Sequence, residues 1–174
     1  MSHTRLALKL KHYGITGCNL GWIKSFLHDH TQQVVLEGTK SGTIPVTSGV
    51  PQGTVLGPLL FLLYINDLPD QVTSSTRLFA DDSLVYRVIR KPQDAEILQS
   101  DLDALQRWEK QWSMEFNATK CHTLRFSRKT KPLTPTYDIH RHTLDLCDTA
   151  PYLGVKLNKS MSWEPQCTAT RQQG

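Results

Sequence analysis

Residues 78–86 read Leu-Phe-Ala-Asp-Asp-Ser-Leu-Val-Tyr, an apolar run of strand-forming residues that two aspartates divide in the middle. Aspartate is unfavourable inside a strand and favourable in a turn, so the run predicts two strands joined at Asp81-Asp82. An Asp-Asp pair occurs by chance about once in 400 residues, so a plain hairpin turn is one explanation. The other is a binding site for Mg²⁺, a hard cation that prefers oxygen ligands.

The two carboxylates can serve one metal site only if the turn breaks the alternation of side chains along a strand. We expect Asp81 to be the direct ligand and Asp82 to be a looser or outer contributor. Two such ions about 4 Å apart can activate a 3′-hydroxyl group and stabilise a departing pyrophosphate. If the pair is more than a turn, it therefore indicates nucleotidyl-transfer chemistry.

A second informative segment lies upstream, where residues 48–61 read Ser-Gly-Val-Pro-Gln-Gly-Thr-Val-Leu-Gly-Pro-Leu-Leu-Phe. Gly49 and Gly53 allow the backbone to approach a ligand closely, and Pro51 stiffens the loop. Gln52 offers both donor and acceptor groups for a nucleotide or a template. The alternative is an ordinary loop that leads into the helix that follows.

Together, and in this order, the two segments resemble reverse transcriptases. The Pro-Gln-Gly loop with its helix is similar to the family's motif B. Residues 79–82 are similar to motif C, the YxDD box, with Phe79 in place of tyrosine. Residues 57–68 are similar to elements of the non-LTR (LINE) type, whereas group II intron and bacterial enzymes usually carry Ser-Pro where this chain has Gly57-Pro58. The chain is thus identified as a member of the non-LTR retrotransposon group of reverse transcriptases.

The resemblance implies an RNA-directed DNA polymerase that adds dNTPs to a primer 3′-hydroxyl by two-metal catalysis with Mg²⁺, or with Mn²⁺ in its place. The implied partners are an RNA template, a DNA primer and dNTPs. The residues implied in catalysis and metal binding are Asp81 and Asp82. The residues implied in substrate contacts are Gly49, Pro51, Gln52, Gly53, Phe79 and Ala80.

Three downstream segments extend the resemblance. Residues 117–120, Asn-Ala-Thr-Lys, are similar to motif D, in which a lysine can donate a proton to departing pyrophosphate. Lys120 is therefore a third candidate catalytic residue, and an ordinary solvated lysine is the alternative. Residues 152–155 are similar to the primer grip, and Ser162-Trp163 is similar to the start of the thumb.

The resemblance also predicts what the chain lacks. Residues 2–15 are similar to the stretch just after motif A, so the third metal-binding aspartate would precede residue 1. We expect residues 1–157 to form a partial fingers and palm region and residues 158–174 to begin a thumb. The chain would then correspond to a reverse transcriptase domain that is truncated at both ends. Without the motif A aspartate the chain is expected to be inactive alone. The alternative is a non-enzymatic or decayed remnant that at most binds nucleic acid or a protein.

Sequence periodicity predicts an α+β fold. The expected helices cover residues 2–13, 20–28, 58–68 and 92–116, and the last has apolar residues at three- and four-residue spacing along one face. The expected strands cover residues 31–37, 43–47, 77–87, 121–127, 136–140, 143–146 and 152–157. We predict a palm-like antiparallel sheet backed by helices, with the fingers and most of the thumb absent.

The composition fits a folded protein: 39% of the residues are hydrophobic and 21% are charged, with a net charge of +4. Basic residues between 120 and 131 could follow a phosphate backbone or form a solvated face. The four cysteines form no CxxC pair, and the longest apolar run, residues 55–68, is too short to span a bilayer. We therefore expect an intracellular protein of the cytoplasm or nucleus with no membrane partner; the sequence leaves the oligomeric state open.

Overall fold

The computed structural model describes residues 1–171 and has an α+β fold. The chain divides into two compact units. The first unit comprises Met1–Val85 and Arg107–Glu115, and the second comprises Tyr86–Gln106 and the described part of the segment from Phe116 onward. The longest helix, α4 (Pro92–Trp112), contributes its first turns to the second unit and its last turns to the first.

Three helices build the first unit: α1 (His3–His12), α2 (Gly17–Leu27) and α3 (Leu56–Ile65). Leu6 and Leu10 of α1 lie one helical turn apart and are fully buried together with Leu60 and Tyr64 of α3. Helix α1 ends in a Schellman motif, in which the N–H of Ile15 donates to the Leu10 carbonyl at 2.9 Å. Gly14, with φ +82°, takes the left-handed position that this motif requires.

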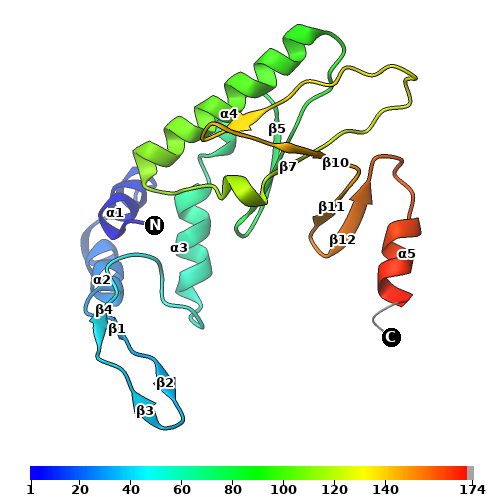
Figure 1. The fold of residues 1–174 in the computed structure, drawn as a ribbon. Helices are drawn as coiled ribbons and strands as arrows, with labels where there is room; N and C mark the ends of the chain where they lie inside the picture. The colour runs from blue at the N-terminus through cyan, green and yellow to red at the C-terminus, as the bar shows by residue number, and fades with distance from the viewer. Residues whose placement is uncertain (172–174) are drawn as a thin grey trace. The chain divides into compact units, whose positions relative to one another are not determined.

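A two-stranded ribbon extends from the helices of the first unit (Figure 1). It consists of two short antiparallel ladders, β1 (Thr31–Gln32) with β4 (Ile44–Pro45) and β2 (Val35–Leu36) with β3 (Thr39–Lys40). The strands expected within residues 31–37 and 43–47 are thus found as the two arms of one hairpin. Its turn falls at Glu37-Gly38, where both residues have positive φ, as hairpin turns of type I′ require.

A second hairpin in the chain is formed by β5 (Ser75–Phe79) and β6 (Asp82–Tyr86). It is connected to α3 through a 3₁₀ turn, η1 (Pro69–Gln71). Pro69, the residue just after the predicted helix, is the first residue of this turn. The predicted division of the β run at Asp81-Asp82 is confirmed.

The second unit contains the first turns of α4. Its strands are β7 (His122–Leu124), β8 (Asp138–Ile139), β9 (His142–Thr143), β10 (Asp145–Cys147), β11 (Thr149–Tyr152) and β12 (Val155–Asn158), followed by α5 (Glu164–Arg171). Two glutamines of α4 attach the β8–β9 hairpin. The Gln99 amide accepts from the Asp138 N–H at 2.9 Å and donates to its carbonyl at 3.0 Å, and Gln106 accepts from the His140 N–H at 2.9 Å.

Helix α4 begins with a side-chain cap. The Asp94 carboxylate accepts hydrogen bonds from the N–H groups of Arg90 and Lys91 at 2.9 and 3.0 Å, and these bonds lower the pKa of that carboxyl group. The predicted apolar stripe is buried at Leu102, Leu105 and Trp108. The predicted helix end at residue 116 is wrong: α4 stops at Trp112, and Ser113 turns the chain with φ +50°.

The prediction of one antiparallel sheet is not met within residues 1–171. The strands there form six separate two-stranded ladders, and β7 pairs with β10 in parallel. The strands of these ladders are short, with two to five residues each. In that same range no helix has the length and apolar character that crossing a bilayer requires.

Candidate functional site

The two aspartates of the β5–β6 hairpin lie at its tip. Ala80 and Asp81 form the two-residue turn, and Ala80 takes a φ of +49°. Asp82 is the first residue of β6. Because Asp81 lies in the turn, the two side chains need not point to opposite faces as neighbours within one strand do. Both are exposed, as is Phe79, whose side chain is 61% accessible. The tip therefore presents two neighbouring carboxylates to solvent.

The loop between residues 48 and 55 is fastened from both sides. On one side it pairs with the start of the chain, where the Gly49 N–H donates to the Met1 carbonyl and the His3 ring bonds the Gly49 carbonyl, both at 2.9 Å. On the other side the Thr54 hydroxyl donates to the Pro51 carbonyl at 2.8 Å and accepts from the Gly57 N–H at 3.0 Å.

These bonds leave the middle of the loop open to solvent. Gln52 and Gly53 are exposed, and Pro51 and Gly49 are half-buried. Gly49 and Gly53 have φ values of +87° and +75°, a left-handed conformation that glycine adopts without strain, and the close approach of a ligand to them stays a prediction. The loop thus offers an exposed amide side chain on a backbone that is fixed at both ends.

The hairpin tip supplies only part of a two-ion centre. Within residues 1–171 no three side chains of His, Cys, Asp or Glu are grouped so that they could hold a metal ion. Asp81 and Asp82 have the donor chemistry that Mg²⁺ prefers, and Mg²⁺ retains several waters and needs few protein ligands. The pair therefore suits weak binding of one hard cation and falls short of holding two.

Lys120 lies in the second unit, at the end of the 3₁₀ turn η2 (Ala118–Lys120), and its side chain is exposed. Asn117 caps this turn by accepting from the Thr119 N–H at 3.1 Å. The cap explains why the turn forms, but it does not involve the Lys120 ammonium and therefore indicates no role for it. Its participation in catalysis stays a prediction.

A model of one protein family, described as reverse transcriptase (RNA-dependent DNA polymerase), matches residues 1–157. The chain belongs to the reverse transcriptase family. It is 31% identical, over 86% of its length, to the RNA-directed DNA polymerase from the mobile element jockey of Drosophila melanogaster. It is also 31% identical, over 97% of its length, to a probable RNA-directed DNA polymerase from the transposon X-element of the same fly.

These relatives confirm the identification as a reverse transcriptase of the non-LTR retrotransposon kind. The chain spans only 17% and 19% of the length of these two proteins. The predicted division at residues 157 and 158 is not tested by the match and stays a prediction.

Gly57 of this reverse transcriptase chain is held in a contact that excludes any side chain. A Cβ atom at this position would lie 2.6 Å from the Pro51 carbonyl oxygen, whereas one at Gly21 in α2 would meet nothing within 4 Å. We expect Gly57→Ala to lower the free energy of unfolding by about 1–3 kcal/mol through overpacking. Gly21→Ala is expected to raise it by up to about 1 kcal/mol, because alanine is the better helix former.

Urea denaturation of the two variants checks this prediction. Each replaces a helical glycine by alanine, and the added Cβ atom meets the Pro51 carbonyl oxygen and the Thr54 hydroxyl at position 57 but nothing within 4 Å at position 21. Equal stability of the two variants would show that the loop does not depend on close approach at Gly57.

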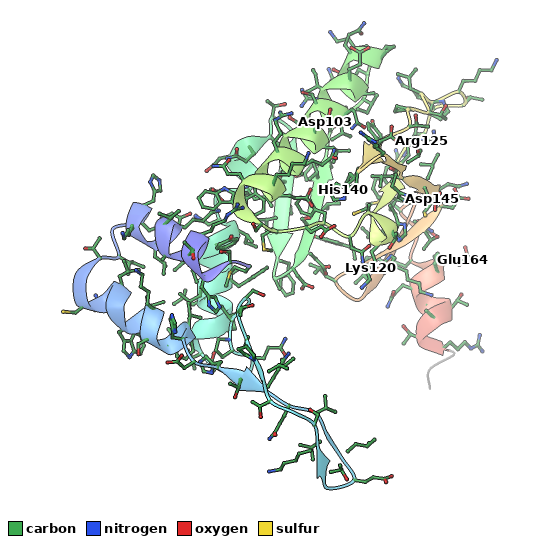
Figure 2. The ribbon with its side chains drawn as sticks, turned by 60° about the vertical axis from the view of Figure 1, so that its left-hand side comes forward. Asp103, Lys120, Arg125, His140, Asp145 and Glu164 are labelled. Atoms are coloured by element: carbon green, nitrogen blue, oxygen red, sulfur yellow. The ribbon has the colours of Figure 1, made fainter. Side chains whose placement is uncertain are left out.

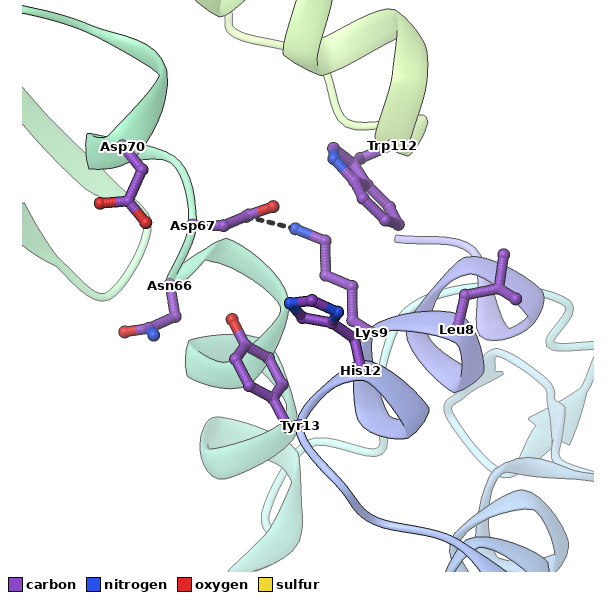
Figure 3. Close-up of a pocket in the computed structure, with 8 residues that line it drawn as sticks. All are labelled: Leu8, Lys9, His12, Tyr13, Asn66, Asp67, Asp70 and Trp112. Atoms are coloured by element: carbon purple, nitrogen blue, oxygen red, sulfur yellow. Dashed lines mark hydrogen bonds and ion pairs between the residues drawn. The ribbon is translucent and has the colours of Figure 1, made fainter.

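A buried lysine that the sequence analysis missed organises the first unit. Lys9 of α1 is 3% exposed and forms an ion pair with Asp67 (Figure 3). Its ammonium also donates to the Tyr64 carbonyl. Its ammonium lies over three aromatic rings, 4.0 Å from the centroid of Trp112, 4.7 Å from that of Trp108 and 5.0 Å from that of Tyr64. Burial lowers the pKa of Lys9, and the hydrogen bond that its ammonium donates to the Asp67 carboxylate opposes that shift.

Asp67 completes this cluster. Its carboxylate also accepts from the Trp108 indole N–H at 3.1 Å, and the Tyr64 hydroxyl donates to the Trp112 carbonyl. The sequence did hold a signal: Leu6, Lys9 and Leu10 have the spacing of one buried helix face, so the lysine among them needed a buried partner. A cavity of about 330 Å³ lies beside the cluster, lined in part by His12, Tyr13 and Asn66.

Proposed function

We propose that this chain is the part of an RNA-directed DNA polymerase that contributes the Asp81-Asp82 hairpin to the metal-binding centre. The observation that carries the proposal is the pair of exposed carboxylates at a two-residue hairpin turn, in a chain of the reverse transcriptase family. A hairpin tip can project carboxylates toward a substrate, because turn residues are not flanked by paired strands as the residues within a sheet are.

The roles of the individual residues follow from their chemistry. Asp81 would bind Mg²⁺ or Mn²⁺ directly, and Asp82 would support it from the start of β6. When bound, the metal supplies positive charge to the reacting phosphate and hydroxyl groups. Phe79 and Ala80 would lie against the primer end, and Lys120 would serve as a proton donor.

The loop would contact the nucleotide or template. Gln52 offers donors and an acceptor from an exposed position, and Gly49, Pro51 and Gly53 set the path of the backbone around it. In the whole polymerase the partners would be an RNA template, a DNA primer and dNTPs. The β5–β6 hairpin and the helices would then form part of a palm-like sheet that further strands complete.

A second candidate is a reverse-transcriptase-like chain that binds nucleic acid without catalysis. It is favoured by one observation, that residues 1–171 contain no group of three metal-binding side chains. The two candidates differ in whether the hairpin binds a divalent ion at all.

Titration of the ¹⁵N-labelled chain with Mn²⁺ tests the proposal. The paramagnetic ion should broaden the amide signals of residues 80–83 first, because their N–H groups surround the two carboxylates. The double variant Asp81→Asn, Asp82→Asn should lose this broadening. Asp29→Asn is the matched control, because Asp29 is an exposed aspartate in a turn with φ +59°, a conformation that asparagine tolerates. Broadening elsewhere, with sharp signals from residues 80–83, would refute metal binding at the hairpin.

A further inference from the structure

One segment holds all of the chain's excess positive charge. Residues 120–137 contain no aspartate or glutamate and five cations, Lys120, Arg125, Arg128, Lys129 and Lys131. The whole chain carries +4 and this segment carries +5, so the remaining residues together carry −1. The basic character of the chain is therefore a local property of this segment.

Most of this charge lies on the connection from β7 to β8, residues 125–137, which we call the basic loop. Figure 1 shows it reaching out from the strands of the second unit. Its two sides are joined where the Arg125 guanidinium, labelled in Figure 2, donates to the Leu133 carbonyl at 3.2 Å. A bond from the Lys129 N–H to the Ser127 hydroxyl at 3.2 Å shapes the turn between them.

The cations of the basic loop are available to a partner. Arg128, Lys129 and Lys131 are exposed, and none of them forms an ion pair with any acidic residue of the chain up to Arg171. By contrast, Lys159 in the same unit is paired with Asp148 at 2.8 Å. Unpaired cations concentrated on one loop attract a polyanion more strongly than the same cations would if dispersed.

An exposed aromatic ring accompanies the cations. Phe126 is 49% exposed and directly follows Arg125. The exposed ring offers a flat apolar face to a ligand beside the cations of the same loop. Cations that track phosphates, together with a ring on which a base can stack, are the combination that binds single-stranded nucleic acid.

We propose that the basic loop binds single-stranded RNA, with Arg128, Lys129 and Lys131 on the phosphates and Phe126 stacked on a base. This contact lies outside the Asp81-Asp82 hairpin and needs no metal ion. The choice of RNA over DNA rests on the proposed function, since an RNA-directed polymerase must hold an RNA strand. The loop would hold that strand independently of catalysis.

Fluorescence anisotropy of a labelled single-stranded RNA of about 16 nucleotides, the upper end of such site sizes, tests the proposal with the full 174-residue chain. The triple variant Arg128→Ala, Lys129→Ala, Lys131→Ala should bind at least about tenfold more weakly. The slope of log affinity against log salt concentration should fall by about 2, since each lost contact to a single strand contributes roughly 0.7. Phe126→Leu should weaken binding by about fivefold or more through lost stacking.

The matched control removes the same charge elsewhere. Lys11, Lys24 and Lys40 are exposed in the first unit, and the triple alanine variant of these residues should bind RNA within about twofold of the parent chain. An equal loss of RNA affinity in both triple variants would show that only the net charge of the chain matters, and it would overturn the proposal. So would tighter binding to single-stranded DNA, to duplex RNA, or to vesicles of phosphatidylserine and phosphatidylcholine.

The failure of this proposal can be told apart from failure of the proposed function. Asp81→Asn should leave RNA binding unchanged, because the hairpin is not part of the basic loop. RNA binding that is lost with Asp81→Asn and kept in the loop variant would overturn the assignment of the contact to the loop. Circular dichroism of the loop variant should match that of the parent chain, since all three replaced side chains are exposed.

Discussion

Lys9→Ala is expected to lower the free energy of unfolding of the first unit by about 3 kcal/mol or more. Removing one partner of a buried ion pair leaves the other without compensation, which costs about 3–5 kcal/mol. Asp67 is 29% exposed and keeps its bond from the Trp108 indole, so water and that donor offset part of the loss. The three aromatic rings lose their cation at the same time, and the space left by the lysine stem adds a cavity term.

Urea denaturation followed by tryptophan fluorescence measures this effect directly, because Trp108 and Trp112 both lie against the Lys9 ammonium. The control is Lys11→Ala on the same helix, whose side chain is exposed and whose loss should change stability by less than about 0.5 kcal/mol. Lys9→Met adds a third point, since it keeps the apolar stem and removes only the charge. Unfolding of Lys9→Ala at the same urea concentration as Lys11→Ala would show that the cluster contributes no stability.

The features that the sequence predicted well are those determined by near neighbours. The Asp81-Asp82 turn follows from two poor strand formers within a strand-forming run, and the long helix α4 follows from its regular apolar spacing. The expected helix over residues 2–13 ends where predicted, because Gly14 adopts a left-handed conformation without strain. In each case the physical cause lies within a few residues of the effect.

The features that the sequence did not predict join distant residues. Lys9 and Asp67 meet only because α1 and α3 pack together, and no local pattern connects them. The parallel pairing of β7 with β10 and the glutamine bridges from α4 to β8 likewise depend on tertiary packing. The sequence around Asp67 resembles that of related elements, but this resemblance contains no information about a lysine 58 residues away.

The 174-residue chain alone is expected to show no primer extension on an RNA template with Mg²⁺ or Mn²⁺ and all four dNTPs. Two-ion catalysis needs ligands that hold both ions, and residues 1–171 supply Asp81 and Asp82 without a third carboxylate beside them. Several kcal/mol of transition-state stabilisation are then missing, and each 1.36 kcal/mol is about tenfold in rate. Robust extension that Asp81→Ala abolishes would mean that another carboxylate completes the centre.

Primer extension can be measured when residues 1–157 are placed inside a longer polymerase. Residues 1–157 would replace the matching segment of the jockey RNA-directed DNA polymerase, to which this chain is 31% identical. We expect the exchanged protein to extend a primer, and we expect Asp81→Ala in it to lower the rate by at least about 10³-fold, because a lost metal ligand removes several kcal/mol. Asp29→Asn should leave the rate within about twofold, since that exposed turn residue is on neither the hairpin nor the loop.

If the exchanged protein extends primers equally well with alanine at position 81, the hairpin does not carry the catalytic metal, whatever its resemblance to motif C. If the exchanged protein is folded by circular dichroism but inactive even with Asp81 intact, then this segment no longer supports polymerisation, and nucleic-acid binding without catalysis becomes the better account of the chain.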